Sequence, residues 1–114
     1  MHELSLCRSL INIVEKKMAE LNPASKQVTT IWLEVGALCA VDTSSLQFYF
    51  PLVAKNTVAE EAELQMVVVP AEAKCLSCQQ EVTVENFGPC PSCHSYGLAV
   101  HHGTDLIIKK MEVR

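Results

Sequence analysis

Four cysteines in the second half of the chain form two close pairs, Cys75-Leu-Ser-Cys78 and Cys90-Pro-Ser-Cys93, with eleven residues between the pairs. Two residues between paired cysteines let both thiolates turn toward one ion from a single tight loop. Two such pairs at short range are typical of a tetrahedral zinc site, and four thiolates leave no open coordination position. We therefore expect Cys75, Cys78, Cys90 and Cys93 to bind a structural zinc ion that organises the fold and does not catalyse.

Two other uses of paired cysteines have to be compared with the zinc site. Thioredoxin-like redox motifs carry one C-x-x-C pair at the start of a helix, whereas Gly88, Pro89 and Pro91 mark turns around the second pair here. Structural disulfides are typical of exported proteins, but residues 1–20 contain charged side chains and no apolar segment of a signal peptide. Zinc is the interpretation that the pattern favours, and the expected setting is a reducing cytoplasm.

The N-terminus, Met1-His2-Glu3, is the second feature that could do chemistry. The free α-amine of Met1, the amide of His2 and the His2 imidazole can close adjacent chelate rings around one metal ion. Amine, deprotonated amide and imidazole form a planar nitrogen set that suits Ni(II) or Cu(II), and the Glu3 carboxylate can complete or orient such a site. A histidine at position 2 usually has no function, and exposed termini are often disordered, but a helix beginning at Leu4 would anchor this one.

Size and charge limit the possible functions. The chain has 114 residues, 49% of them hydrophobic, which is enough for one domain with a small appendage. No stretch approaches the ~20 apolar residues of a membrane span, so no membrane partner is expected. The formal net charge is −4 and the nine basic residues form no dense stripe, which argues against nucleic-acid binding.

Hydrophobic periodicity predicts the elements that must position these residues. Residues 4–21 have the spacing of an amphipathic helix that ends at Asn22-Pro23, and residues 27–35 alternate as a strand. Asp42 is expected to cap a second helix that is kinked at Pro51 or broken near Phe50.

Further strands are expected at 63–69 and 105–113, with a short one at 81–84. The predicted fold class is α+β: two helices packed on a roughly three-stranded mixed sheet, with an inserted four-cysteine zinc ribbon. Residues 1–72 plus 97–114 would form an α/β domain that carries the N-terminal metal site, and 73–96 the zinc-ribbon insertion.

The other cysteines and histidines are expected to have structural roles and not to bind metal. Cys7 and Cys39 are expected to be core thiols, because free cysteine behaves as a small apolar residue. His94 directly follows Cys93 and can replace a thiolate or orient the site, but four cysteines already suffice. The pair His101-His102 is expected in a solvated loop before Gly103.

The N-terminal segment MHELSLC, the segment WLEVGA at 32–37 and the cysteine pairs with His94 resemble the HypA/HybF family of nickel-insertion proteins. The resemblance extends along the whole chain, including residues 106–109. It implies a nickel metallochaperone for NiFe-hydrogenase maturation, and not an enzyme. In this family nickel binds at the N-terminal segment, so the resemblance implies His2 as principal Ni(II) ligand, with Glu3 beside it, and structural Zn(II) on the four thiolates.

The resemblance also implies partners: a HypB-type GTPase and the precursor of the hydrogenase large subunit, while a homodimer stays open. Three alternatives remain. The protein could be a zinc-ribbon interaction or nucleic-acid-binding module without nickel transfer, a thiol oxidoreductase that uses the C-x-x-C pairs, or a nickel chaperone whose client is urease.

Overall fold

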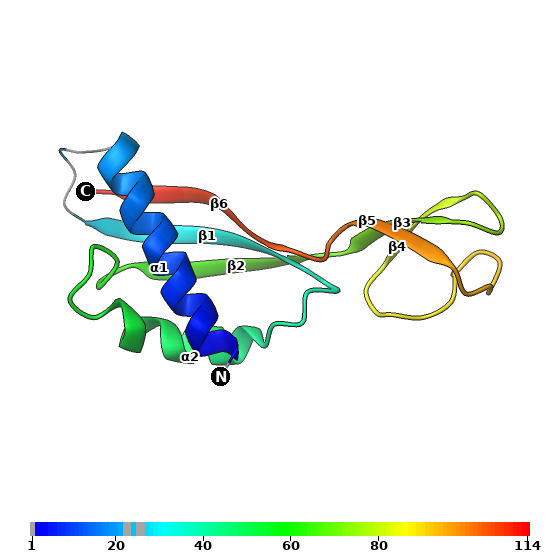
Figure 1. Ribbon diagram of the computed structural model, residues 1–114, viewed down its shortest axis with the longest axis horizontal. Coiled ribbons are helices and arrows are strands. Elements are labelled where there is room, and N and C mark those ends of the chain that lie inside the picture. The colour runs from blue at the N-terminus through cyan, green and yellow to red at the C-terminus, as the bar shows by residue number, and fades with distance from the viewer. Residues whose placement is uncertain (1, 22–23, 25–26) are drawn as a thin grey trace. The chain divides into compact units, whose positions relative to one another are not determined.

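The computed structural model describes residues 2–21, 24 and 27–114 (Figure 1). These residues contain two helices and six strands in two three-stranded sheets, which is the predicted α+β class. The elements are α1 (His2–Leu21), β1 (Val28–Gly36), α2 (Thr43–Ala54), β2 (Glu63–Val69), β3 (Ala71–Cys75), β4 (Glu81–Val84), β5 (Leu98–His102) and β6 (Leu106–Val113). Neither of the helices described is long and apolar enough to cross a membrane.

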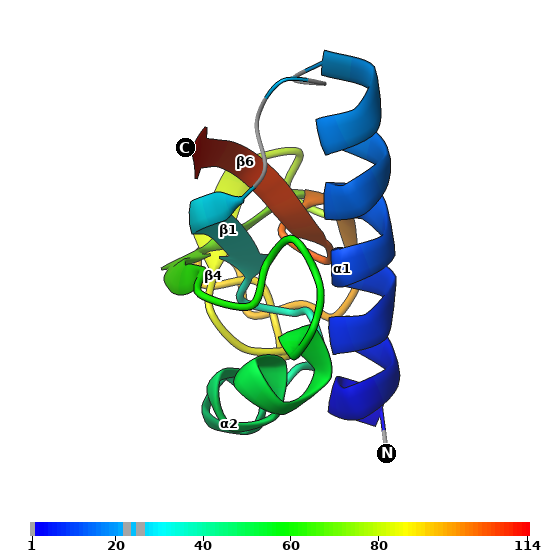
Figure 2. The same cartoon turned by 90° about the vertical axis from the view of Figure 1, so that its left-hand side faces the viewer.

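Helix α1 buries the predicted apolar stripe and lies alongside β1 and β6 (Figure 2). The buried residues recur at three- and four-residue steps and are Cys7, Leu10, Ile11, Val14 and Met18. Leu21, the last residue of the predicted amphipathic helix, is 66% exposed. The helix begins at His2 instead of Leu4, and Glu3 in its first turn favours that start through the helix dipole. The predicted stop at Asn22-Pro23 lies outside the described residues.

Helix α2 begins where the sequence predicts and continues through Pro51. The Asp42 carboxylate accepts hydrogen bonds from the amides of Ser44 (3.0 Å) and Ser45 (3.3 Å), which is an N-cap. Of the two outcomes expected at the proline, a kink or a break near Phe50, the break does not occur, because the helix passes through Pro51 and ends at Ala54. Proline removes one helix hydrogen bond, and the burial of Leu46, Phe50 and Ala54 on one face holds the last turn in place.

The first sheet has the strand order β2-β1-β6 and is mixed. Strands β1 and β2 run in the same direction, and the Ala37 amide donates to the Val69 carbonyl where both strands end (Figure 1). Strand β6 runs the opposite way, with Thr29 near the start of β1 bonded to Glu112 near the end of β6. One face of β1 is buried, as predicted, and presents Ile31, Leu33 and Val35.

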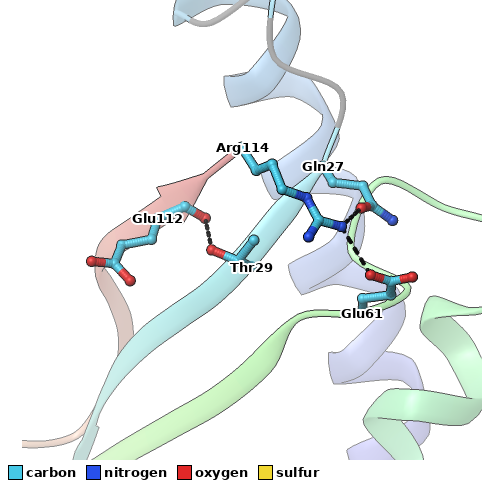
Figure 3. A network of polar contacts seen from close by, with 5 residues as sticks. All are labelled: Gln27, Thr29, Glu61, Glu112 and Arg114. Atoms are coloured by element: carbon cyan, nitrogen blue, oxygen red, sulfur yellow. Dashed lines mark hydrogen bonds and ion pairs between the residues drawn. The ribbon is translucent and has the colours of Figure 1, made fainter.

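A polar network fixes the C-terminal end of β6 beside the start of β1 (Figure 3). The Arg114 guanidinium donates to the Gln27 side chain and to the Glu61 carboxylate, the latter at 3.0 Å. The Thr29 hydroxyl donates to the Glu112 carbonyl at 3.2 Å. These contacts join segments more than fifty residues apart, so they hold the register of a strand that the chain reaches last.

The second sheet has the order β4-β3-β5, with both pairings antiparallel. It contains the short strand predicted at 81–84, and β3 alternates buried and exposed residues. The chain divides into two compact units: the described residues up to Leu33 with Val41–Met66 and Ile108–Arg114, and Glu34–Ala40 with Val67–Ile107. The boundaries expected from the sequence, 1–72 plus 97–114 and 73–96, stay a prediction.

Candidate metal sites

The Sγ atoms of Cys75, Cys78, Cys90 and Cys93 all lie within 4.8 Å of one another. Two of the sulfur–sulfur separations are 3.6 Å (Cys75 to Cys93) and 3.9 Å (Cys78 to Cys90). Zinc–thiolate bonds of about 2.3 Å place the sulfurs of a tetrahedron about 3.8 Å apart. The donor set therefore fits a four-coordinate zinc ion, and it is the one group of three or more such ligands among the described residues.

Each cysteine pair lies in a loop with the same backbone hydrogen bonds, at residues 75–80 and 90–95. The amide of the fifth residue, Gln79 or His94, donates to the carbonyl of the first cysteine at 3.0 and 2.8 Å. The amide of that cysteine donates in turn to the carbonyl of the sixth residue, at 3.0 and 2.8 Å. Two equivalent turns thus present two thiol pairs to one point.

His94 has a definite place in this arrangement. Its φ is 66° and that of Gln79 is 65°, so both occupy the left-handed region, which residues other than glycine rarely adopt. His94 is exposed, and its imidazole is not in the ligand group. His94 and Gln79 occupy the equivalent position in the two cysteine turns, and this role in the turn explains why a residue with positive φ follows Cys93.

Backbone amides donate hydrogen bonds to two of the four sulfurs. The Cys78 amide donates to the Cys75 Sγ at 3.4 Å, and the Ser92 amide donates to the Cys90 Sγ at 3.3 Å. The first of these contacts is the main cause that lowers the pKa of Cys75. Cys75 and Cys90 are buried, while Cys78 and Cys93 are half-buried.

The other two thiols differ strongly in acidity. Hydrogen bonds from the side chain and the amide of Ser95 lower the pKa of Cys93 to about 6. At Cys78 the Gln80 amide lowers the pKa, but burial and the neighbouring thiols outweigh it and raise the pKa to about 11. At neutral pH a metal ion would thus meet a preformed thiolate at Cys93.

At the other end of the chain, His2 is the first residue of α1 and its side chain is exposed. The amides in the first turn of a helix have no acceptor within the helix. A metal can therefore take the His2 amide nitrogen without breaking a helix hydrogen bond. Met1, whose amine is the third expected donor, lies outside the described residues.

Glu3 is half-buried, and its Oε2 accepts a hydrogen bond from the Asp42 amide at 3.3 Å. The contact joins the expected nickel-binding segment to the residue that caps α2. Sequence reasoning found Asp42 only as a helix cap. The two residues are 39 positions apart, and no local pattern reports such a contact.

The remaining thiols and imidazoles are placed as follows. Cys7 is fully buried and its thiol donates to the Leu46 carbonyl at 3.7 Å, which confirms it as a core thiol, but Cys39 is only half-buried. The expected loop at His101 and His102 is wrong, because both belong to β5. His102 pairs with Glu72 of β3, and His101 lies at the irregularity in the pairing of β3 with β5.

Comparison with known proteins gives the family. The family model described as hydrogenase/urease nickel incorporation, metallochaperone, hypA matches residues 1–113. The chain therefore belongs to the HypA family, a family of nickel-incorporation metallochaperones, as the sequence resemblance predicts.

Individual relatives agree with the family model. The chain is 44% identical to the hydrogenase maturation factor HybF of Escherichia coli O157:H7 over 99% of both chains. It is 39% identical to the hydrogenase maturation factor HypA of Rhodopseudomonas palustris (strain BisA53), again over 99% of both. The solution structure of the Ni metallochaperone HypA from Helicobacter pylori has the same fold: 22% identity, TM-score 0.72, covering 97% of this chain and 96% of that one.

Proposed function

We propose that this protein carries Ni(II) and delivers it to the precursor of a NiFe-hydrogenase large subunit. The observation that carries the proposal is the family match over residues 1–113. The matched range includes His2, the exposed first residue of α1. The relatives named as hydrogenase maturation factors support hydrogenase as the client.

The proposed nickel ligands are the Met1 amine, the amide and imidazole of His2, and the Glu3 carboxylate as a further or orienting group. A carrier has to hold its ion against loss and still release it. A planar nitrogen site at a chain end leaves one side open to an incoming ligand, so nickel can pass to a partner through a shared-ligand intermediate. Protons compete for each nitrogen, so affinity falls on acidification.

The proposed role of Cys75, Cys78, Cys90 and Cys93 is to hold a structural Zn(II) ion. The sulfur separations of 3.6 and 3.9 Å and the two equivalent turns support this role. A closed tetrahedral site supplies folding free energy and no vacant position for substrate. We accordingly propose a carrier and not an enzyme.

The proposed partners are a HypB-type GTPase and the hydrogenase precursor, and a homodimer is compatible with both. We propose that the protein acts in the cytoplasm, because the proposed zinc site needs four reduced thiols. The family description names urease beside hydrogenase, so urease is the second candidate client. A zinc-ribbon interaction module without nickel transfer is the remaining alternative.

A transfer assay tests the proposal. Untagged protein loaded with radioactive nickel is mixed with the GTPase, GTP and either the hydrogenase precursor or apo-urease. We expect nickel to appear in the hydrogenase precursor faster than from free Ni(II) in the presence of a competing chelator. Transfer to apo-urease alone would move the client to urease, and protein that never retains nickel would refute the carrier function.

A further inference from the structure

The two outer strands of the described β2-β1-β6 sheet differ in charge (Figure 1). Strand β6 contains Lys109, Lys110 and Glu112, and charged side chains on an outer strand disfavour pairing with another strand. In β2 and the two residues after it, the segment LQMVVVPA at 64–71 contains no charge, although the net charge of the chain is −4. Strand β2 therefore lacks the protection against pairing that β6 has.

Hydrogen bonds at the two ends of β2 show which of its backbone groups face away from β1. The Val69 carbonyl accepts from the amide of Ala37, directly after β1, at 2.8 Å. The Leu64 carbonyl accepts instead from the Gln47 side chain of α2, also at 2.8 Å. Alternate residues of a strand direct their amides and carbonyls to opposite edges. Leu64, Met66 and Val68 thus present theirs to the outer edge of β2.

Part of this outer edge is left uncovered. Gln47 occupies the Leu64 end, but within the described part of the chain no group outside the sheet bonds to the backbone of Met66 or Val68. The side chains of Val67 and Val68 are 59% and 60% exposed. Pro70 follows and has no amide, so the usable edge ends there. The open part of the edge is centred on Val67, and unpaired strand groups of this kind are completed by another strand.

The open edge is complementary to a second copy of itself. If two copies meet antiparallel about a two-fold axis at Val67, Met66 of each copy lies opposite Val68 of the other, and each such pair exchanges both of its backbone hydrogen bonds. In this register Glu63 lies opposite Ala71, so no acidic side chains face each other. A register centred on Met66 would bring in the occupied Leu64 carbonyl, and one centred on Val68 would bring in Pro70.

We propose that β2 pairs with β2 of a second copy of this chain, antiparallel and with the two-fold axis at Val67. The pairing joins the two copies of the three-stranded β2-β1-β6 sheet into one continuous sheet. The charged β6 strands remain at its two outer edges. The pairing uses no metal ligand and is independent of the proposed nickel transfer.

Sedimentation equilibrium of zinc-loaded, nickel-free protein tests the pairing, and we expect a reversible dimer. The two Val67 side chains are direct neighbours in this register, so Val67→Lys or Val67→Glu alone should weaken the dimer at least about tenfold by like-charge repulsion. An equimolar mixture of these two variants should form a dimer again, because opposite charges then meet. Gln65→Lys is the matched control, since residue 65 lies opposite Val69 and brings no like charges together.

Val68→Pro gives an independent test of the backbone contribution. Proline is tolerated on an outer strand where its missing amide faces away from the sheet, so the monomer should keep its helix signal while the dimer is lost.

Three results would overturn the proposal. A dimer that persists in Val67→Lys would place the interface elsewhere in the chain. Charge-swapped variants that stay monomeric when mixed would exclude a two-fold axis at Val67. A parent protein that is monomeric at the concentrations of NMR, with Met66 and Val68 amides that shift only on addition of the GTPase or the hydrogenase precursor, would assign the edge to that partner and refute self-pairing.

Discussion

The Glu3 carboxylate accepts a hydrogen bond from the Asp42 amide at 3.3 Å, and Asp42 in turn caps α2 through the amides of Ser44 and Ser45. The first turn of α1 is thereby tied to the first turn of α2. His2 and Glu3, two of the proposed nickel ligands, thus belong to a helix turn that is bonded to the cap of α2.

Glu3→Gln tests this connection. The amide side chain can still accept from Asp42 but has no charge for the metal, so we expect near-normal stability and weaker nickel binding. Glu3→Ala removes both, and the free energy of unfolding should fall by about 0.5–1.5 kcal/mol. Thermal denaturation and nickel titration of both variants separate the two effects. Equal nickel affinity in all three proteins would exclude Glu3 from the site.

Removal of zinc should destabilise the unit that contains the four cysteines, Glu34–Ala40 with Val67–Ile107, far more than the other unit. A chelator, or Cys75→Ser, should remove hydrogen-exchange protection from the amides of Cys75, Cys90 and the β3–β5 sheet, because the thiol turns have little other support. The amides of the α1 core, such as Val14, should keep theirs. Hydrogen exchange read by NMR checks the expectation. Unchanged protection at Cys75 and Cys90 in zinc-free protein would show that the turns do not depend on metal.

The thiols of metal-free protein should differ in reactivity. The pKa of Cys93 is lowered to about 6, so at pH 7 it is mainly thiolate and should be the first cysteine alkylated by iodoacetamide. The pKa of Cys78 is raised to about 11, so Cys78 should react slowly. The rate at Cys93 should fall as the pH drops through about 6, where the thiolate is protonated. Peptide mapping by mass spectrometry gives the order, and a faster reaction at Cys78 would contradict it.

Gly36 should tolerate no side chain. A Cβ there would lie 2.1 Å from the Gly103 carbonyl oxygen, and relief of such overpacking typically costs about 1–3 kcal/mol. Gly36→Ala should therefore lower the denaturation midpoint. Gly88→Ala is the control, since a Cβ at Gly88 meets nothing within 4 Å. Equal midpoints for the two variants would show that the close approach of Gly36 and Gly103 is not maintained in solution.

Local patterns predicted most of the fold. The buried stripe of α1, the Asp42 cap and the alternation of Ile31, Leu33 and Val35 follow from periodicity and capping, which act within one turn or one strand. A break near Phe50, one of the two outcomes expected at Pro51, does not occur, because tertiary burial of Leu46 and Ala54 outweighs one lost hydrogen bond.

The metal sites were predicted only in part, because local patterns report some of their residues and not the contacts between distant segments. The spacing of the cysteine pairs is a local signal, and the structure brings their sulfurs together. The loop expected at His101-His102 failed because strand pairing with β3 is a long-range effect. Two further features depend on the folded backbone and have no local signal. They are the contact of Glu3 with Asp42 and the equivalent positions of Gln79 and His94 in the two cysteine turns.

The most direct test of the central claim is a calorimetric Ni(II) titration of zinc-loaded protein with its native N-terminus, compared with His2→Ala and with N-terminally acetylated protein. The account predicts one tight nickel site in the native protein, lost in His2→Ala and strongly weakened by acetylation, with zinc content and helix signal unchanged in all three. Tight nickel binding that persists in His2→Ala would contradict it and place the nickel site elsewhere in the chain.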